Sequence, residues 1–287
     1  MQKMRRSKSI KQGNGASQKR ASPLNPTLGA VPTGWLPSCR TRPRPVAFPF
    51  YVRGTDFRGD NFIMPPRLGF RIISDVPRPP AVIVQAFRGK ASSNVADAMG
   101  RFHFMDPGMV SRTRLPLCGV AVTVNARPGD NLMVHKALEV AGPGDVVVVS
   151  TNGNTTSAVF GELMGAAAVG ARLGGIVVDG AIRDVDGLKA MGFPAFSRTV
   201  TPGGCDKDGP GEINVPIACG NTVVMPGDIV VGDEDGVAVV PREDATQVLD
   251  LVRALEERER ERVAEINAGE LFKAEINKAL RAKGALE

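Results

Sequence analysis

The chain is 287 residues long, 43% hydrophobic, and carries a formal net charge of +6. That length can bury a sizeable core in one large domain or two small ones, and its 33 glycines and 22 prolines exclude a coiled coil and favour a turn-rich α/β or β-rich fold. No apolar run reaches the length of a membrane span. The four cysteines contain no CxxC pair, which argues against a zinc site and for ordinary thiols in a reducing, cytoplasmic compartment.

The positive charge belongs to the first 63 residues. Residues 1–63 hold 12 basic and 2 acidic residues, whereas residues 64–287 hold 24 basic and 28 acidic ones. The first segment is rich in proline and has no helix or strand periodicity, so we expect a disordered extension before a domain that spans 64–287. A nucleic-acid-binding arm and an organelle transit peptide are alternatives, but a tail without a nameable function, or a true start at Met64, is favoured. A signal peptide is not expected, because no apolar segment follows the basic residues.

Patterns of hydrophobic residues and turn residues predict alternating helices and strands after residue 79. In chain order, helices are expected at 79–87 and 92–99 (the second capped by Ser92 or Ser93), a strand at 120–125, a helix at 131–140 and a buried strand at 145–150. A polar loop at 152–156, a helix rich in small residues at 160–173 and a buried strand at 175–178 follow. The chain then turns at Asp179–Gly180, and a helix at 183–191 and a strand at 195–197 come next. Short strands at 213–240 and a charged helix at 243–283, broken near Gly269, complete the prediction.

Arg183 and Asp184 are the first candidate site residues, because they follow a buried strand and open the next helix. Ligands of open α/β sheets bind at the carboxyl ends of strands, and a helix N-terminus offers free N–H groups to an anion. Arginine supplies a permanent bidentate cation, and aspartate supplies a hard oxygen ligand for Mg²⁺. The alternative is structural: Asp184 would stabilise the helix dipole, and Arg183 would form a surface ion pair.

The polar stretch Asn152–Thr156 is the second candidate. A loop that contains glycine after a buried strand suits phosphate or carboxylate binding through backbone N–H groups, although a plain connection has the same composition. It is neither a GxGxxG motif nor a P-loop, which disfavours nucleotide binding.

Several blocks of sequence, in order, resemble the RraA-like family, which includes 4-hydroxy-4-methyl-2-oxoglutarate/4-carboxy-4-hydroxy-2-oxoadipate aldolases. The resemblance covers roughly residues 81–243. The matching blocks are Val95–Met99, Pro128–Leu132, Pro143–Val148, Gly161–Met164, Asp179–Asp184, Met225–Val231 and Asp235–Pro241. It implies a swivelling β/β/α domain of α/β class, with a helical C-terminus, assembled as a homotrimer or hexamer with sites between subunits.

The resemblance also implies a class II pyruvate aldolase that uses Mg²⁺ or Mn²⁺, with oxaloacetate decarboxylation as a side activity. In that reading Asp184 ligates the metal and Arg183 holds the keto or enolate oxygen. The backbone N–H groups of Leu163 and Met164, next to Gly161, grip the pyruvoyl carboxylate. Retro-aldol cleavage places negative charge on the keto oxygen, which a divalent ion and a guanidinium would stabilise.

An acidic residue precedes the Arg-Asp pair by the family's spacing of twenty intervening residues. Here that residue is Glu162, where the family usually has aspartate; it would order a water on the metal. Glutamates of the C-terminal helix could lend a carboxylate to a neighbouring site, or simply form a solvated face: Glu256, Glu257, Glu259 and Glu261. We predict structural roles for His103, in a loop, and for His135, in an amphipathic helix.

Two other functions compete with the aldolase. A non-catalytic regulator that binds a ribonuclease would need the same fold but no metal. Methyl transfer to a quinone has no support, because no glycine-rich S-adenosylmethionine loop follows an early strand. A nucleic-acid or membrane partner is not expected.

Overall fold

The computed structural model describes residues 68–287, so the expectations for the basic extension of residues 1–63 and for a domain start at residue 64 lie outside the described part. The helices are α1 (Ala81–Phe87), α2 (Ser92–Ala98), α3 (Leu132–Val140), α4 (Glu162–Gly170), α5 (Val185–Ala190), α6 (Ala245–Asn267) and α7 (Ala274–Ala282). The strands are β1 (Val110–Ser111), β2 (Leu117–Ala126), β3 (Val146–Ala158), β4 (Gly175–Ile182), β5 (Ala195–Val200), β6 (Gly211–Ile213), β7 (Ile217–Cys219), β8 (Thr222–Val224), β9 (Ile229–Asp233) and β10 (Gly236–Val240).

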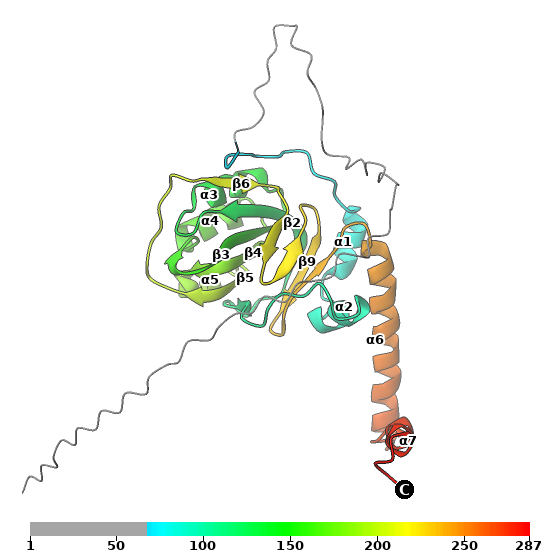
Figure 1. Ribbon diagram of the computed structural model, residues 1–287. Helices are drawn as coiled ribbons and strands as arrows, with labels where there is room; N and C mark the ends of the chain where they lie inside the picture. The colour runs from blue at the N-terminus through cyan, green and yellow to red at the C-terminus, as the bar shows by residue number, and fades with distance from the viewer. Residues whose placement is uncertain (1–67) are drawn as a thin grey trace, which may run out of the picture. The chain divides into compact units, whose positions relative to one another are not determined.

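A mixed sheet forms the centre of the domain (Figure 1). Its strand order is β1-β5-β4-β3-β2-β9-β10, and β6 pairs with the carboxyl end of β2. Strands β2, β3, β4 and β5 run parallel, and β1, β6, β9 and β10 add antiparallel edges. The parallel strands therefore send their carboxyl ends to one edge of the sheet, where ligands of such sheets bind.

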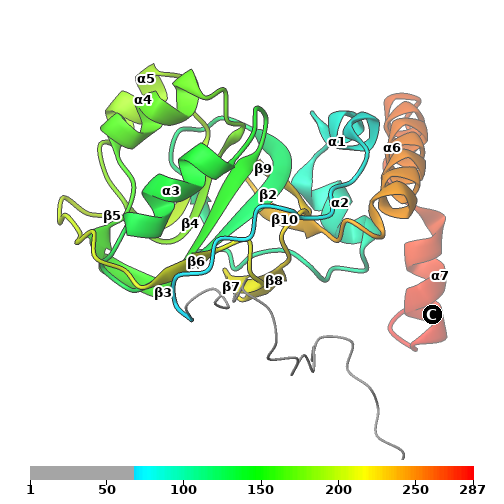
Figure 2. The ribbon, with the colours of Figure 1, turned by 90° about the horizontal axis from the view of Figure 1, so that it is seen from above.

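Both faces of the sheet are covered, which explains why its central strands are apolar without alternation. Along β3, Val147 and Val149 pack under α3, α4 and α5, whereas Val146 and Val148 face the hairpin of β7 and β8. Figure 2 shows the three helices on one side of the sheet and the hairpin on the other. These helix, sheet and hairpin layers confirm the expected α/β fold of β/β/α type.

A separate hydrophobic cluster joins α1, α2 and α6 to β9 and β10. The buried side chains of α6 lie in its first half and end at Val252, and α7 buries none. The expected break near Gly269 is confirmed, since this residue has a φ of 101° between the two helices. Within residues 68–287, no helix is both long enough and apolar enough to cross a membrane.

Three local predictions were wrong. The N-cap of α2 is Ala91, without a side-chain cap, because the Ser92 hydroxyl instead donates to Asp233 Oδ1 at 2.6 Å. The stretch Asn152–Thr156 belongs to β3, and Asp179–Gly180 belongs to β4, because the two strands continue to pair beyond an irregularity in their register. That pairing between distant segments supplies hydrogen-bond partners that the local sequence does not reveal.

Candidate active site

A cavity of about 250 Å³ lies where β3 and β4 end. Its walls come from α3, the start of α4, the β4–α5 junction and the loop after β5. The lining residues are Asn131, His135, Ala158, Phe160, Gly161, Leu163, Met164, Arg183, Asp184, Gly204, Cys205 and Lys207. Five of the six site residues that the resemblance implied are in this lining, and Glu162 is the one that is not. The second candidate, Asn152–Thr156, does not contribute to the lining, and neither do the glutamates of the C-terminal helix.

Arg183 and Asp184 occupy a sharp bend between β4 and α5. The Arg183 N–H donates to the Phe160 carbonyl at 2.9 Å, as the last bond before the chain turns. Asp184 then adopts φ 55° and ψ 41°, a left-handed conformation that aspartate tolerates better than most residues. Both side chains stay about half exposed, and Arg183 Nε lies 3.3 Å from Asp184 Oδ2. The bend therefore presents a cation and a carboxylate together at the cavity wall.

The N-terminus of α4 faces the same bend through Gly161, its N-cap. A Cβ at this position would lie 2.6 Å from Asp184 Oδ2 and 2.9 Å from Arg183 Cγ, so any residue other than glycine would displace these two side chains. The Glu162 N–H donates to Asp184 Oδ2 at 3.2 Å. The N–H groups of Leu163 and Met164 belong to the first helical turn, which has no intrahelical acceptor, and both residues line the cavity. This helix end can hold an anion.

The Glu162 side chain lies against α5. A Cβ at Gly187 would come within 2.6 Å of Glu162 Cδ, so the glutamate covers the backbone of α5 at that glycine. In this arrangement its carboxylate lies against Gly187 of α5, and Glu162 is not among the residues that line the cavity.

Lys207 and Cys205 reach the cavity on the loop after β5, and sequence reasoning missed both. The buried carboxylate of Asp130 anchors this loop by accepting the N–H groups of Asp208 at 2.7 Å and Gly209 at 2.8 Å. Burial alone would raise the pKa of Asp130, but three backbone N–H donors and the charge of Arg127 outweigh it and lower the pKa. The conspicuous sequence Gly129-Asp130 could have suggested an anchor, but not its partner loop.

The cavity wall carries two cationic side chains beside the carboxylate of Asp184. Arg183 and Lys207 both line it, and partial desolvation together with the charge of Lys207 lowers the pKa of His135, although this side chain remains exposed. Burial also raises the pKa of the Cys205 thiol. His135 lies on the exposed face of α3, which forms part of the cavity wall, and its structural role stays a prediction.

Asn131 adds a buried polar atom to this wall. Its Nδ2 donates to the Val159 carbonyl at 3.2 Å, and its Oδ1 is buried without a hydrogen-bond partner among the described residues. A buried acceptor of this kind normally has a donor. A hydroxyl group of a ligand, or a water molecule, in the cavity would donate to Asn131 Oδ1.

The donor set suits a hard, water-rich cation. Asp184 Oδ2 is engaged by the Glu162 N–H and by Arg183, while no bond reaches Oδ1 from residues 68–287. Mg²⁺ commonly takes one or two carboxylates and completes its shell with water and ligand oxygens. No group of three or more histidine, cysteine or acidic side chains that could hold a metal occurs in the described part of the chain, which disfavours a fully protein-ligated ion there.

A family model described as "RraA-like: Aldolase/RraA" matches residues 92–239, about half of the chain. The chain belongs to the RraA-like family. A Halalkalibacterium halodurans protein, provisionally named as a 4-hydroxy-4-methyl-2-oxoglutarate aldolase, is 47% identical over 131 residues, which are 46% of this chain and 62% of that protein. The match thus spans less than two thirds of that relative.

Two further RraA-like proteins bear on function. The 4-hydroxy-4-methyl-2-oxoglutarate aldolase of Thermus thermophilus is 34% identical over 112 residues, which are 39% of this chain and 68% of that protein. The crystal structure of Streptomyces coelicolor RraAS2, titled an unusual member of the RNase ES inhibitor RraA protein family, has a TM-score of 0.59 and 27% identity. That similarity covers 67% of this chain and 99% of RraAS2.

Proposed function

We propose that this RraA-like protein is a divalent-metal-dependent pyruvate aldolase. Its substrate would be a 4-hydroxy-2-oxoacid such as 4-hydroxy-4-methyl-2-oxoglutarate, which it would cleave to pyruvate and a second oxoacid. One observation carries the proposal: Arg183, Asp184 and the uncapped N-terminus of α4 converge on one small cavity. The names of the aligned relatives point to a carbon–carbon lyase of the same kind.

The residues of this chain divide the work between binding and charge stabilisation. The N–H groups of Leu163 and Met164 hold the pyruvoyl carboxylate. The Arg183 guanidinium donates to the keto oxygen at C2. When a water molecule in the cavity takes the proton of the C4 hydroxyl, C4 becomes a carbonyl, the C3–C4 bond breaks, and its electron pair forms the enolate of pyruvate. Arg183 meets the charge that develops on the keto oxygen, and protonation at C3 then gives pyruvate.

In this proposal Asp184 would hold Mg²⁺ or Mn²⁺, and Glu162 would add a second negative charge to this side of the site. When bound, the metal would act as a Lewis acid toward the keto oxygen. Loss of CO₂ from oxaloacetate passes through the same enolate, so oxaloacetate decarboxylation is proposed as a side activity.

We also propose that the chain assembles as a homotrimer or hexamer with sites between subunits. Of the glutamates that could reach a neighbour, Glu256 accepts from Lys90 at 2.6 Å and Glu259 accepts from Asn94 at 2.8 Å within the same chain. Those two bonds tie α6 to the segment around α2, which supports a structural role for Glu256 and Glu259.

A ribonuclease regulator is the second candidate, since the fold is similar to that of RraAS2. Coupled detection of pyruvate across a panel of 4-hydroxy-2-oxoacids, with Mg²⁺ and with a chelator, separates the two. An aldolase releases pyruvate from at least one member of the panel, and the chelator stops it. Absence of release from the whole panel, together with binding to a ribonuclease that persists in the chelator, would establish the regulator instead.

A further inference from the structure

A β-bulge interrupts β4 four residues before Arg183. On the β5 side, Val178 pairs with Ser197 and Ala181 pairs with Thr199, so two residues of β4 lie opposite the single residue Arg198. Bulges bend a strand and increase its twist, and they are frequent beside active sites, where they redirect side chains. This one lies between the regular part of the sheet and the bend that carries the candidate catalytic residues.

Hydrogen bonds made by Asp179 hold the bulge in place. Asp179, 7% exposed, accepts from Arg198 Nε on the opposite strand and from the Gly220 N–H at 2.8 Å. Its carbonyl accepts from Thr151 Oγ1 of β3 at 2.7 Å. Side-chain bonds thus fix the backbone at the place where the strand ladder is irregular on both sides.

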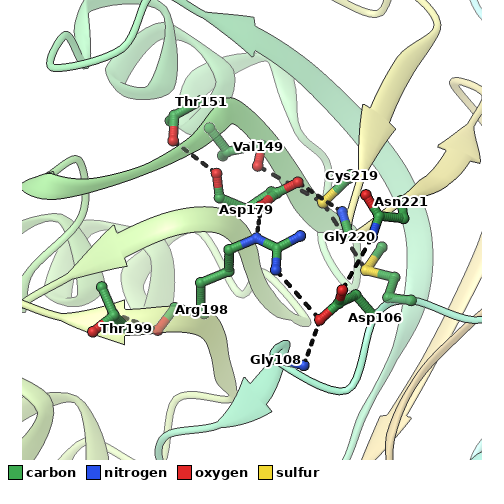
Figure 3. A network of polar contacts seen from close by, with 12 residues as sticks. Asp106, Gly108, Val149, Thr151, Asp179, Arg198, Thr199, Cys219, Gly220 and Asn221 are labelled. Carbon is green, nitrogen blue, oxygen red and sulfur yellow. Dashed lines mark hydrogen bonds and ion pairs between the residues drawn. The ribbon is translucent and has the colours of Figure 1, made fainter. Parts of the chain in front are cut away.

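Arg198 is held from a second direction. Its Nη1 lies 3.3 Å from Asp106 Oδ1, and that carboxylate also accepts from the Gly108 N–H at 2.7 Å and from Asn221 Nδ2 at 3.0 Å. Figure 3 shows the arginine extending from β5 between the two carboxylates. A guanidinium fixed by two carboxylates cannot easily swing away from the bulge.

Beyond the bulge, β4 and β5 resume regular pairing and reach the cavity together. Ile182 pairs with Val200, and the Thr201 N–H donates to the Ile182 carbonyl at 3.1 Å. Arg183 follows directly on β4, and the loop that carries Lys207 follows on β5. The offset that the bulge introduces is therefore transmitted to both walls of the cavity.

We propose that Asp179 and Arg198 are a positioning pair, which sets the direction in which β4 delivers Arg183 and Asp184 and their placement relative to the loop of Lys207. Neither residue lines the cavity, so the pair acts through the backbone. The catalytic consequence rests on the proposed aldolase function; the structural one does not.

The test uses the full chain with Asp179→Asn, Arg198→Lys and the control Asp145→Asn. The control also removes a buried aspartate paired with an arginine, but at the amino end of β3. Misplacement by about 1 Å can lower a rate by about 100-fold. We therefore expect kcat to fall by about 10- to 100-fold in Asp179→Asn, with a smaller loss in Arg198→Lys, which keeps a cation at the bulge. KM should change by less than about threefold, because α4 still holds the carboxylate.

Hydrogen exchange gives a readout that does not depend on activity. The N–H groups of Arg183 and Thr201 should exchange at least about tenfold faster in Asp179→Asn than in the control. If Asp179→Asn does not fold, Arg198→Lys should show the same acceleration in weaker form. Unchanged exchange at both N–H groups would overturn the proposal, as would an equal loss of kcat in Asp145→Asn. If the wild-type chain releases no pyruvate, the aldolase proposal fails, and the exchange rates alone decide whether the pair positions the bend.

Discussion

Aspartate and glycine have opposite roles at two edges of the sheet: the amino edge, where the parallel strands begin, and the carboxyl edge, where they end. At the amino edge, Asp145 is 1% exposed, and its carboxylate accepts from Arg78 and from the Gly142 N–H. At the carboxyl edge, Asp184 is about half exposed, and one of its two oxygens has no bond from residues 68–287. An aspartate whose oxygens are all engaged stabilises the fold, whereas one with an unengaged oxygen at a cavity is available to a ligand.

The glycines of the two edges differ in the same way. A Cβ at Gly174, at the amino edge, would meet the backbone carbonyl of Gly144 at 2.7 Å. A Cβ at Gly161, at the carboxyl edge, would meet the side chains of Asp184 and Arg183. Backbone cannot move without disturbing the sheet, but partly exposed side chains can. Substitutions at the amino edge should therefore affect stability, and those at the carboxyl edge should affect activity.

The largest expected effect is that of Asp184→Ala. Loss of the candidate metal ligand should lower Mg²⁺-dependent pyruvate release by at least about a thousandfold. The free energy of unfolding should fall by only about 1–2 kcal/mol, because the half-exposed side chain loses one bond from the Glu162 N–H and alanine tolerates the left-handed φ of 55° less well than aspartate. Activity at saturating Mg²⁺, measured beside a denaturant curve, checks both parts, and full activity would remove Asp184 from the site.

Arg183→Lys should have the second-largest effect on activity. An ammonium on a flexible stem cannot reproduce the fixed geometry of a guanidinium, so kcat should fall by about 100- to 1,000-fold, the scale on which one preorganised oxyanion donor acts. Arg183→Ala should be at least as harmful. The matched change Arg78→Lys, at the amino edge, should leave kcat unchanged. If Arg183→Lys raises only KM, the arginine anchors a carboxylate and does not stabilise the enolate.

Gly161→Ala and Gly174→Ala compare the two edges directly. Gly161→Ala should reduce kcat by roughly 10- to 100-fold, because the added methyl group displaces Asp184 and Arg183. Gly174→Ala should instead lower the free energy of unfolding by about 1–3 kcal/mol, as overpacking does. Denaturant curves and steady-state kinetics on both variants test the contrast. Equal losses of stability would show that the two edges do not differ.

Asp145→Asn should lower the free energy of unfolding by about 1–2 kcal/mol and leave kcat intact. The buried side of the pair loses a charge-assisted hydrogen bond. Arg78 is 48% exposed, so solvent compensates most of its lost partner. Urea denaturation at pH 7 measures the change, and a large drop in kcat at unchanged stability would contradict it.

The smallest effect concerns pH. Burial lowers the pKa of His135 in the folded chain below the ordinary value of about 6.5. Between these two pKa values, His135 is protonated in the unfolded chain but largely neutral in the folded chain. The free energy of unfolding should therefore decrease as the pH falls from the unfolded pKa toward the folded one. His135→Gln should flatten that decrease as the pH falls below about 6.5. Denaturation at several pH values, for both chains, would show it, and parallel curves would refute it.

Sequence patterns could predict the elements that depend on local periodicity, but not the contacts that complete the site. The buried strands β3 and β4 and the position of Arg183 and Asp184 at a strand end follow from apolar runs bounded by polar residues. The loop of Lys207 carries no such pattern, and long-range bonds to the Asp130 carboxylate and to the backbone of Gly129 and Asn131 bring it to the cavity. The stretch Asp179–Gly180 has the composition of a turn, yet long-range bonds hold it in a strand. Here too, the deciding contacts come from residues far away in the sequence.

The contact between Glu162 and Gly187 links two positions that any comparison of related sequences would otherwise treat separately. A methyl group at 187 would lie 2.6 Å from Glu162 Cδ and 2.9 Å from its Cγ, so a side chain at 187 fits only if the exposed glutamate turns away from α5. Replacing Gly187 should therefore move the carboxylate at 162, and the two positions should covary.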